Sequence, residues 1–308
     1  MNVVELKGVT KRFDEFVAVR DLSFEVRRGT VFGLLGPNGA GKTTSIRMIV
    51  NIFAPDSGEV VVFGQHVSNQ LQQRIGYLPE ERGLYKKMKV GEQLVFFASL
   101  KGLSREVAES RADEWLRRME LSDWKNKKAI ELSKGMQQKV QFIATVLHDP
   151  DFLILDEPFS GLDPVSVNLL KQAILDLKER GKSIIFSTHQ MEQVEQMCDD
   201  ICLINHATKV LGGSLREVKR RFGRNTVILD YEGANSFLTH DLVKRQNRFA
   251  NYSELLLNEG ADPQEVLRRA IAAGARVNRF EMVEPSLNEI FIDSVKGKDE
   301  KGADNPQA

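Results

Sequence analysis

The chain alternates short apolar runs with segments of helical periodicity along most of its length. Continuous apolar runs at residues 31–35, 152–155 and 183–187 predict buried strands, because strands covered on both faces lack polar alternation. Helical periods lie at 44–50 and over most of 90–149. Strands that alternate with helices predict an α/β fold with a mainly parallel core sheet and helices on its faces.

Shorter apolar runs predict a second set of strands around this core. Residues 3–6 and 22–26 flank a turn at 12–16 and predict an antiparallel β part at the N-terminus. Residues 59–63 are rich in β-branched side chains, and the run at 75–79 ends at a proline, so both are expected to be strands.

Capping residues mark the expected helix starts. Ser104 and Ser133 precede helical periods, and Asp163 precedes Pro164, which is favoured at the first position of a helix. The helices between residues 84 and 149 are therefore expected to form a subdomain of their own.

The pattern changes near Gly223, after which the elements become shorter and more polar. Strands are expected at 226–231, 254–257 and 276–283, with helices at 263–273 and 286–295. The sequence thus predicts a first domain at 1–222, a small α+β domain at 223–295 and a disordered, charged tail at 296–308.

The segment from Gly36 to Thr43 matches G-x-x-x-x-G-K-[ST], the phosphate-binding P-loop, between an expected strand and an expected helix. Its glycines allow successive backbone N–H groups to surround a phosphate chain, and the helix N-terminus adds partial positive charge. Lys42 is expected on the β- and γ-phosphates and Thr43 on Mg²⁺. The candidate nucleotide-binding residues here are Asn38, Gly39, Ala40, Gly41, Lys42, Thr43 and Thr44.

A pair of carboxylates ends the apolar run at 152–155. Asp156 is placed to hold Mg²⁺ and Glu157 to polarise the attacking water, as in the Walker B pattern. Phosphoryl transfer depends on positioning and charge stabilisation, so this pair can serve as its catalytic centre together with Lys42.

The segment Leu132-Ser133-Lys134-Gly135-Met136-Gln137-Gln138 resembles the LSGGQ signature of ATP-binding cassette (ABC) ATPases, with Ser133 and Gly135 matching and Lys134 and Met136 departing. In that family this element closes on nucleotide held by the other subunit's P-loop. The resemblance therefore implies ATP and Mg²⁺ as ligands and a head-to-tail dimer with a second cassette subunit, expected to be identical.

Four further positions match or depart from that family. Asp163, in Ser160-Gly161-Leu162-Asp163, is similar to the D-loop, and His189 resembles the switch histidine that contacts the γ-phosphate. Phe13 resembles the aromatic residue that stacks on adenine, although core packing is an open alternative, whereas Phe16 is expected in the core. Glu80 stands where the family usually has a glutamine that touches Mg²⁺, so its effect on the metal is left open.

The resemblance implies the ATPase subunit of a membrane exporter. Residues 224–295 resemble, more weakly, the C-terminal extension of exporter cassettes, most clearly at 285–291. A separate membrane permease is the expected partner, docked where Leu84, Tyr85 and residues 95–97 offer apolar contacts, unless these aromatics are ordinary core.

Composition narrows the alternatives. Lys+Arg and Asp+Glu both number 43, so the chain has no net positive charge that would attract nucleic acid. We therefore expect no nucleic-acid partner. No apolar run reaches the ~18 residues of a membrane span, and the first residues do not resemble a signal peptide. We expect a cytoplasmic protein, peripheral on the inner face of the cell membrane. A soluble cassette ATPase acting on DNA or ribosomes and a P-loop small-molecule kinase are the alternatives.

Overall fold

The computed structural model describes residues 1–66, 68–81, 83–222, 226–233, 235–258, 260–292 and 294. The chain divides into two compact units, Met1–Leu215 and Arg216–Ala308. The boundary predicted from the sequence, between residues 222 and 223, lies after helix α8 (Leu215–Arg221) rather than at its start. The tail predicted at 296–308 lies outside the described residues.

A six-stranded sheet forms the centre of the first unit, with strand order β10-β9-β3-β8-β7-β6. Its strands are β3 (Val31–Leu35), β6 (Ile75–Leu78), β7 (Phe152–Asp156), β8 (Ser183–Thr188), β9 (Asp200–Asn205) and β10 (Thr208–Ser214). All neighbours pair in parallel except β9 and β10. This confirms the expected parallel core sheet, although the β9–β10 hairpin was not predicted.

An antiparallel sheet lies beside it, with strand order β2-β1-β4-β5. It contains β1 (Asn2–Phe13), β2 (Phe16–Arg27), β4 (Ser57–Val62) and β5 (Gln65–His66). Its apolar face shares one core with helix α1 (Lys42–Ile49) and with β7, where Leu6, Ile46 and Phe152 are fully or almost fully buried. The antiparallel N-terminal part is therefore confirmed, with longer strands than the apolar runs alone predict.

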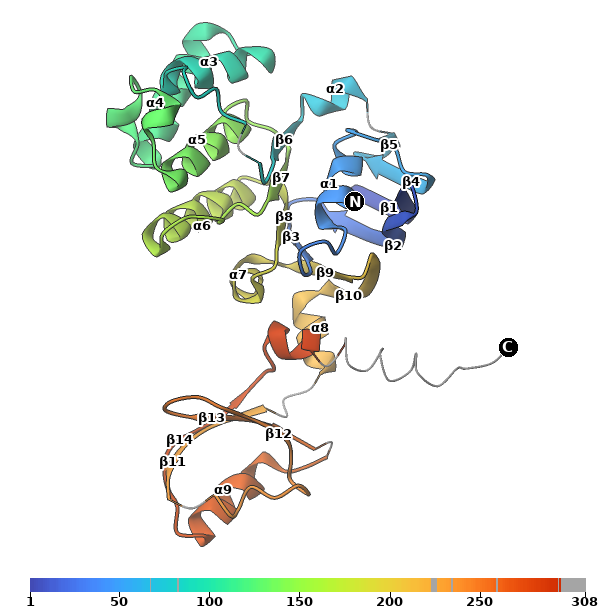
Figure 1. Cartoon of the computed structure of the whole chain (residues 1–308), viewed down its shortest axis with the longest axis vertical. Coiled ribbons are helices and arrows are strands. Elements are labelled where there is room, and N and C mark those ends of the chain that lie inside the picture. The colour runs from blue at the N-terminus through green and yellow to red at the C-terminus, as the bar shows by residue number, and fades with distance from the viewer. Residues whose placement is uncertain are drawn as a thin grey trace. The chain divides into compact units, whose positions relative to one another are not determined.

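Three helices of the first unit group together, away from the antiparallel sheet (Figure 1). They are α3 (Val90–Leu100), α4 (Arg105–Arg118) and α5 (Lys134–Val146), joined by 3₁₀ turns at Ser122–Trp124 and Ala129–Glu131. The Ser104 hydroxyl accepts from Val107 N at 3.4 Å and the Ser133 hydroxyl from Met136 N at 3.2 Å, so both predicted N-caps are confirmed. Trp115 and Phe142 pack edge to face and join α4 to α5.

Three more helices belong to the first unit. Helix α2 (Asn69–Gln72) is a single turn, and α6 (Pro164–Glu179) and α7 (Met191–Met197) connect the last strands of the parallel sheet. Asp163 caps α6 as predicted, because its carboxylate accepts from Val165 N and Ser166 N, both at 3.0 Å. Among the described residues, we find no helix with the length and apolarity that a membrane crossing needs.

The second unit is a four-stranded antiparallel sheet, ordered β12-β13-β11-β14, with helix α9 (Pro263–Ala272) on one face. Its strands are β11 (Thr226–Glu232), β12 (Val243–Arg248), β13 (Ser253–Leu257) and β14 (Arg276–Val283). Residues 287–292 are helical and begin with a capping box, in which Ser286 N donates to the Glu289 carboxylate and Glu289 N donates to the Ser286 hydroxyl. Val295, the predicted end of this helix, lies outside the described residues.

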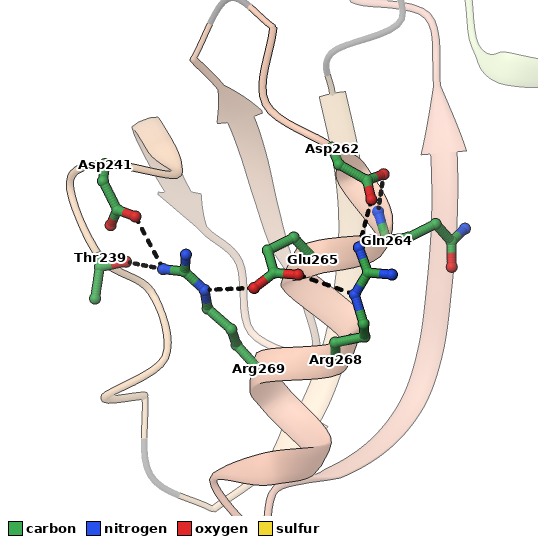
Figure 2. A network of polar contacts seen from close by, with 7 residues as sticks. All are labelled: Thr239, Asp241, Asp262, Gln264, Glu265, Arg268 and Arg269. Carbon is green, nitrogen blue, oxygen red and sulfur yellow. Dashed lines mark hydrogen bonds and ion pairs between the residues drawn. The ribbon is translucent and has the colours of Figure 1, made fainter.

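A network of exposed charges fixes the start of α9 (Figure 2). The Asp262 carboxylate accepts from Gln264 N at 2.9 Å and from Arg268, which also donates to Glu265 at 2.9 Å. Arg269 donates to Glu265, Thr239 and Asp241 at 2.9–3.0 Å and so ties the helix to the loop before β12. Each exposed ion pair contributes little alone, but together they neutralise both arginines locally.

We predict that a chain ending at residue 222 folds and binds nucleotide. The parallel sheet, the antiparallel sheet and the P-loop all lie before this point, with their own apolar core. Thermal unfolding and binding of a fluorescent ATP analogue would measure both properties. Insoluble protein, or a chain that unfolds without cooperativity, would show that the first unit depends on the second.

Candidate functional site

Three neighbouring parallel strands bring the predicted chemical groups to one edge of the sheet. In the register of β3, β8 and β7, Leu35 pairs with Thr188, and Ser187 pairs with Asp156. The P-loop follows Leu35, Asp156 ends β7 and His189 follows Thr188. Ligands bind at the carboxyl ends of such strands, because the loops that follow them open there.

The P-loop depends on glycine at two close contacts. Gly41 caps α1 with φ 108°, a backbone conformation that disfavours other residues, and a Cβ there would lie 2.5 Å from Ala18 O. A Cβ at Gly36 would lie 2.1 Å from Ile204 O. The loop is therefore pressed against β2 and β9, which fixes the direction of the first N–H groups of α1.

Lys42 is buried beneath the loop it closes. Its side chain is only 6% exposed, and Nζ donates to Gly36 O at 2.8 Å and Pro37 O at 3.1 Å. Burial lowers the pKa of Lys42, while the negative charges of Glu157, Asp156 and Glu80 oppose that shift. A triphosphate would offer this ammonium a stronger acceptor than two carbonyls.

Asp156 is fully buried with one oxygen satisfied and one not. Its Oδ1 accepts from the Ser187 hydroxyl, whereas Oδ2 is buried without a hydrogen-bond partner. An orphaned buried carboxylate oxygen is costly unless it binds a cation or water. The Thr43 hydroxyl and the Glu80 carboxylate lie in the same cavity as Asp156. These oxygen atoms therefore fit Mg²⁺, which prefers oxygen ligands.

Glu157 is held by the end of β8. It adopts φ 48°, an uncommon conformation for a residue with a Cβ, and its backbone N donates to Ser187 O at 3.1 Å. His189 Nδ1 donates to its carboxylate at 2.8 Å, and the Thr188 hydroxyl donates at 3.4 Å. These contacts orient a carboxylate that is only 8% exposed toward the P-loop cavity.

The P-loop cavity has a volume of about 340 Å³ and joins many of the predicted residues. It is lined by Phe16, Ala18, Asn38, Gly39, Gly41, Lys42, Thr43, Thr44, Glu80, Asp156 and Glu157. Ala40, a residue of the loop, is buried, and His189 does not line the cavity but contacts Glu157, which does. Phe13, Ser133, Gly135 and Asp163 do not line it.

The signature segment instead packs on the segment before α6. A Cβ at Gly135 would lie 3.4 Å from Gly161 O and from the Leu162 side chain, and Gln138 Nε2 donates to Pro158 O at 3.2 Å. This contact joins the start of α5 to the loop that follows Glu157. The Asp163 carboxylate is occupied by its own helix cap.

Comparisons with known proteins agree with this geometry. A family model described as ABC transporter matches residues 19–160, and the C-terminal domain model of DrrA1-3-like ATP-binding proteins matches 213–295. The uncharacterized ABC transporter ATP-binding protein YhaQ of Bacillus subtilis is 45% identical over 294 residues, which span 95% of this chain and 98% of that protein. The chain belongs to the ABC transporter ATP-binding protein family.

Two further relatives extend this ABC assignment. The linearmycin resistance ATP-binding protein LnrL of Bacillus subtilis is 31% identical over 302 residues, 94% of this chain and 97% of that protein. A solved structure described as the ATP-binding subunit of an ABC transporter superposes with a TM-score of 0.67 at 31% identity, covering 72% of this chain and 93% of the other. ABC cassettes bind ATP and hydrolyse it to power transport.

The aromatic residues of this ABC cassette differ from expectation in one respect. Phe16 was expected in the core, but its side chain is 63% exposed and lines the P-loop cavity. Phe13 pairs with it across the β1–β2 turn and packs edge to face on Phe53, with centroids 5.5 Å apart. Apolar character alone could not distinguish them, because the hairpin register decides which ring faces the cavity.

We predict that Phe16→Ala weakens ATP binding about 5- to 150-fold, since stacking on a base contributes about 1–3 kcal/mol. Phe13→Ala is the matched comparison, because the family resemblance assigns stacking to Phe13. Titration with ATP and with tripolyphosphate separates base contacts from phosphate contacts. Unchanged ATP binding by Phe16→Ala, with loss in Phe13→Ala, would place the base on Phe13 alone.

Proposed function

We propose that the chain is the ATP-hydrolysing subunit of an ABC exporter, which dimerises around two MgATP and drives a separate membrane subunit. The observation that carries this proposal is the meeting of Lys42, Asp156 and Glu157 in one cavity at the P-loop. A buried cation, an orphaned carboxylate oxygen and an oriented second carboxylate together match what phosphoryl transfer to water requires.

Each group has a distinct task in hydrolysis. Lys42 and the N–H groups at the start of α1 hold the phosphates, while Glu157 orients and polarises the water that attacks the γ-phosphorus. His189 holds the Glu157 carboxylate in place, and by the family resemblance it would contact the γ-phosphate. Thr43 and Asp156, with Glu80 in the same cavity, would hold Mg²⁺, which would supply positive charge beside the phosphate oxygens.

The proposed dimer gives a role to the predicted site residues that do not line the P-loop cavity. Ser133 and Gly135 lie at the N-terminus of α5, which offers free N–H groups to an anion, yet they do not line this cavity. In a head-to-tail pair they would close on the nucleotide of the partner cassette, with the Asp163 loop at the seam. An identical partner is the simplest arrangement, because one chain carries both surfaces.

Exposed apolar side chains support docking to a membrane subunit from the inner face of the membrane. Tyr85 is 52% and Phe96 39% exposed, and both rings contact Phe97, so these aromatics are not ordinary core. Export is the direction we propose, because LnrL is a resistance protein by name and the similarity continues through the C-terminal unit.

We predict that Glu157→Gln binds MgATP but hydrolyses it about 10²- to 10⁴-fold more slowly, because the water-polarising carboxylate is lost while positioning groups remain. ATP should then accumulate in a closed dimer. Gel filtration with saturating MgATP measures the assembly, and Lys42→Ala, which lacks the phosphate-binding charge, is the control. A Glu157→Gln protein that binds MgATP and elutes as a monomer would contradict the dimer.

We further predict that Glu80→Gln retains ATPase activity but changes the Mg²⁺ concentration needed for half-maximal rate. Glu80 shares the cavity with Asp156 and Glu157, so its removal takes one negative charge from the metal's surroundings. ATPase rates measured against Mg²⁺ and Mn²⁺ for both proteins decide this. Superimposable curves would mean that Glu80 does not face the metal.

A further inference from the structure

A single hydroxyl group lies between the two carboxylate residues of the site. Ser187, on β8, pairs with Leu34 of β3 on one side and with Asp156 of β7 on the other. It is 0% exposed and follows residues 184–186, which are equally buried and apolar. A polar side chain in the middle of a buried sheet costs free energy unless hydrogen bonds satisfy it, so the partners of this hydroxyl explain why it is tolerated.

The Ser187 hydroxyl both donates and accepts a hydrogen bond. It donates to Asp156 Oδ1, because an ionised carboxylate can only accept, and its oxygen accepts from Glu157 N at 3.3 Å. The second Asp156 oxygen, Oδ2, has no partner. One side chain therefore contacts the carboxylate of Asp156 and the backbone of Glu157 at the same time.

The backbone conformation of Glu157 depends on the same serine. Glu157 has φ 48°, and its N–H also donates to Ser187 O at 3.1 Å, so the carbonyl and the hydroxyl of one residue share this donor. A residue with a Cβ keeps such a conformation only where surrounding contacts impose it. In a regular strand the side chains of Asp156 and Glu157 would point to opposite faces, whereas here both line the P-loop cavity.

Removing this hydroxyl would disturb both carboxylate residues. Asp156 would lose the contact that fixes the rotation of its carboxylate group. Glu157 N would keep the Ser187 carbonyl but lose the hydroxyl, so the turn would remain but be held less tightly. Loss of a group that orients a metal ligand typically costs about 10- to 100-fold in metal affinity or activity.

We propose that Ser187 is a positioning residue of the site, whose hydroxyl holds the Asp156 carboxylate and the Glu157 backbone in the relative placement that metal binding and water activation require. Ser187 acts through these two residues, since it does not itself line the cavity. This inference rests on the proposed function, because it assumes hydrolysis of MgATP. It goes beyond that function by naming the residue that fixes the two carboxylates relative to each other.

Ser187→Ala tests the proposal, and Ser183→Ala is the matched control. Ser183 lies on the same strand, about 13 Å away at about 3.3 Å per residue. It is 1% exposed, and its hydroxyl accepts from Gly29 N at 2.9 Å. Each substitution thus removes one buried hydrogen bond of β8, but only Ser187→Ala removes it at the site. Thermal unfolding should show two folded proteins with similarly lowered midpoints.

The first measurement is Mn²⁺ binding to the protein–ADP complex, followed by the loss of the electron paramagnetic resonance signal of free Mn²⁺. Ser187→Ala should weaken this binding about 10- to 100-fold, with ADP affinity in EDTA unchanged, because the phosphate-binding groups are intact. Ser183→Ala should bind Mn²⁺ as the wild type does. Equal Mn²⁺ affinity in the two serine variants would overturn the proposal.

An Asp156→Asn background decides whether Ser187 acts through the carboxylate. There, Ser187→Ala should change Mn²⁺ affinity less than about twofold, because no carboxylate remains to be oriented and the two effects are not additive. An undiminished loss in this background would mean that Ser187 does not act through Asp156.

The rate of ATP hydrolysis at saturating Mg²⁺ tests the contact with Glu157. Ser187→Ala should lower kcat about tenfold with little change in KM, since saturating metal does not restore the placement of Glu157. Full kcat at saturating Mg²⁺ would overturn the role toward Glu157 and keep the role toward Asp156. A wild-type protein that hydrolyses no ATP, or whose ADP complex binds Mn²⁺ no better than free ADP, would overturn the proposed function and this inference with it.

Discussion

The hydrogen-bonded register of β3, β8 and β7 is the constraint on which the site depends. Because Leu35, Thr188 and Asp156 lie at nearly the same level of the sheet, the segments that follow them must share one small volume. The phosphate loop, the two carboxylates and the histidine are thereby brought together, although the loop lies more than 100 residues before the other three in the sequence. A shift of one residue in any pairing would turn these side chains to the other face.

Burial makes this arrangement electrostatically demanding. Lys42 and Asp156 are both buried away from water. The Lys42 ammonium donates to two backbone carbonyls, and the Asp156 carboxylate accepts from a serine hydroxyl. Neither set of partners satisfies its group fully, because Asp156 Oδ2 has no partner and the pKa of Lys42 is lowered by burial. The groups that lack full hydrogen-bonding partners are those that a metal–nucleotide complex would satisfy. The free-energy cost of burying them without these partners therefore favours binding.

Local signals explain how much of this could be predicted from the sequence. The P-loop, the Asp156–Glu157 pair and the caps at Ser104, Ser133 and Asp163 each depend on a few consecutive residues beside an apolar run. Strand β12 and the β9–β10 hairpin were missed because β12 is almost entirely polar and β10 contains two adjacent glycines. The direction of the Phe16 side chain and the cavity between β6, α3 and α5 depend on tertiary contacts, namely the hairpin register and the approach of α3 and α5 to β6, which no local pattern encodes.

Two cavities of the first unit are joined by one short segment of chain. Tyr77, Leu78 and Pro79 line the cavity of about 450 Å³ between β6, α3 and α5, whereas the next residue, Glu80, lines the P-loop cavity. The backbone between them spans only a few ångströms per residue, so a displacement of this segment by an occupant of one cavity must alter the wall of the other. Coupling of this kind needs a physical element that both ligands bias, and strand β6 with its C-terminal continuation is such an element. Strand β6 begins at Ile75, whose carbonyl accepts from Lys101 at 3.3 Å, and Glu80 lies just beyond its end. An occupant that displaces β6 in one cavity would therefore change binding in the other, with equal coupling free energy in both directions.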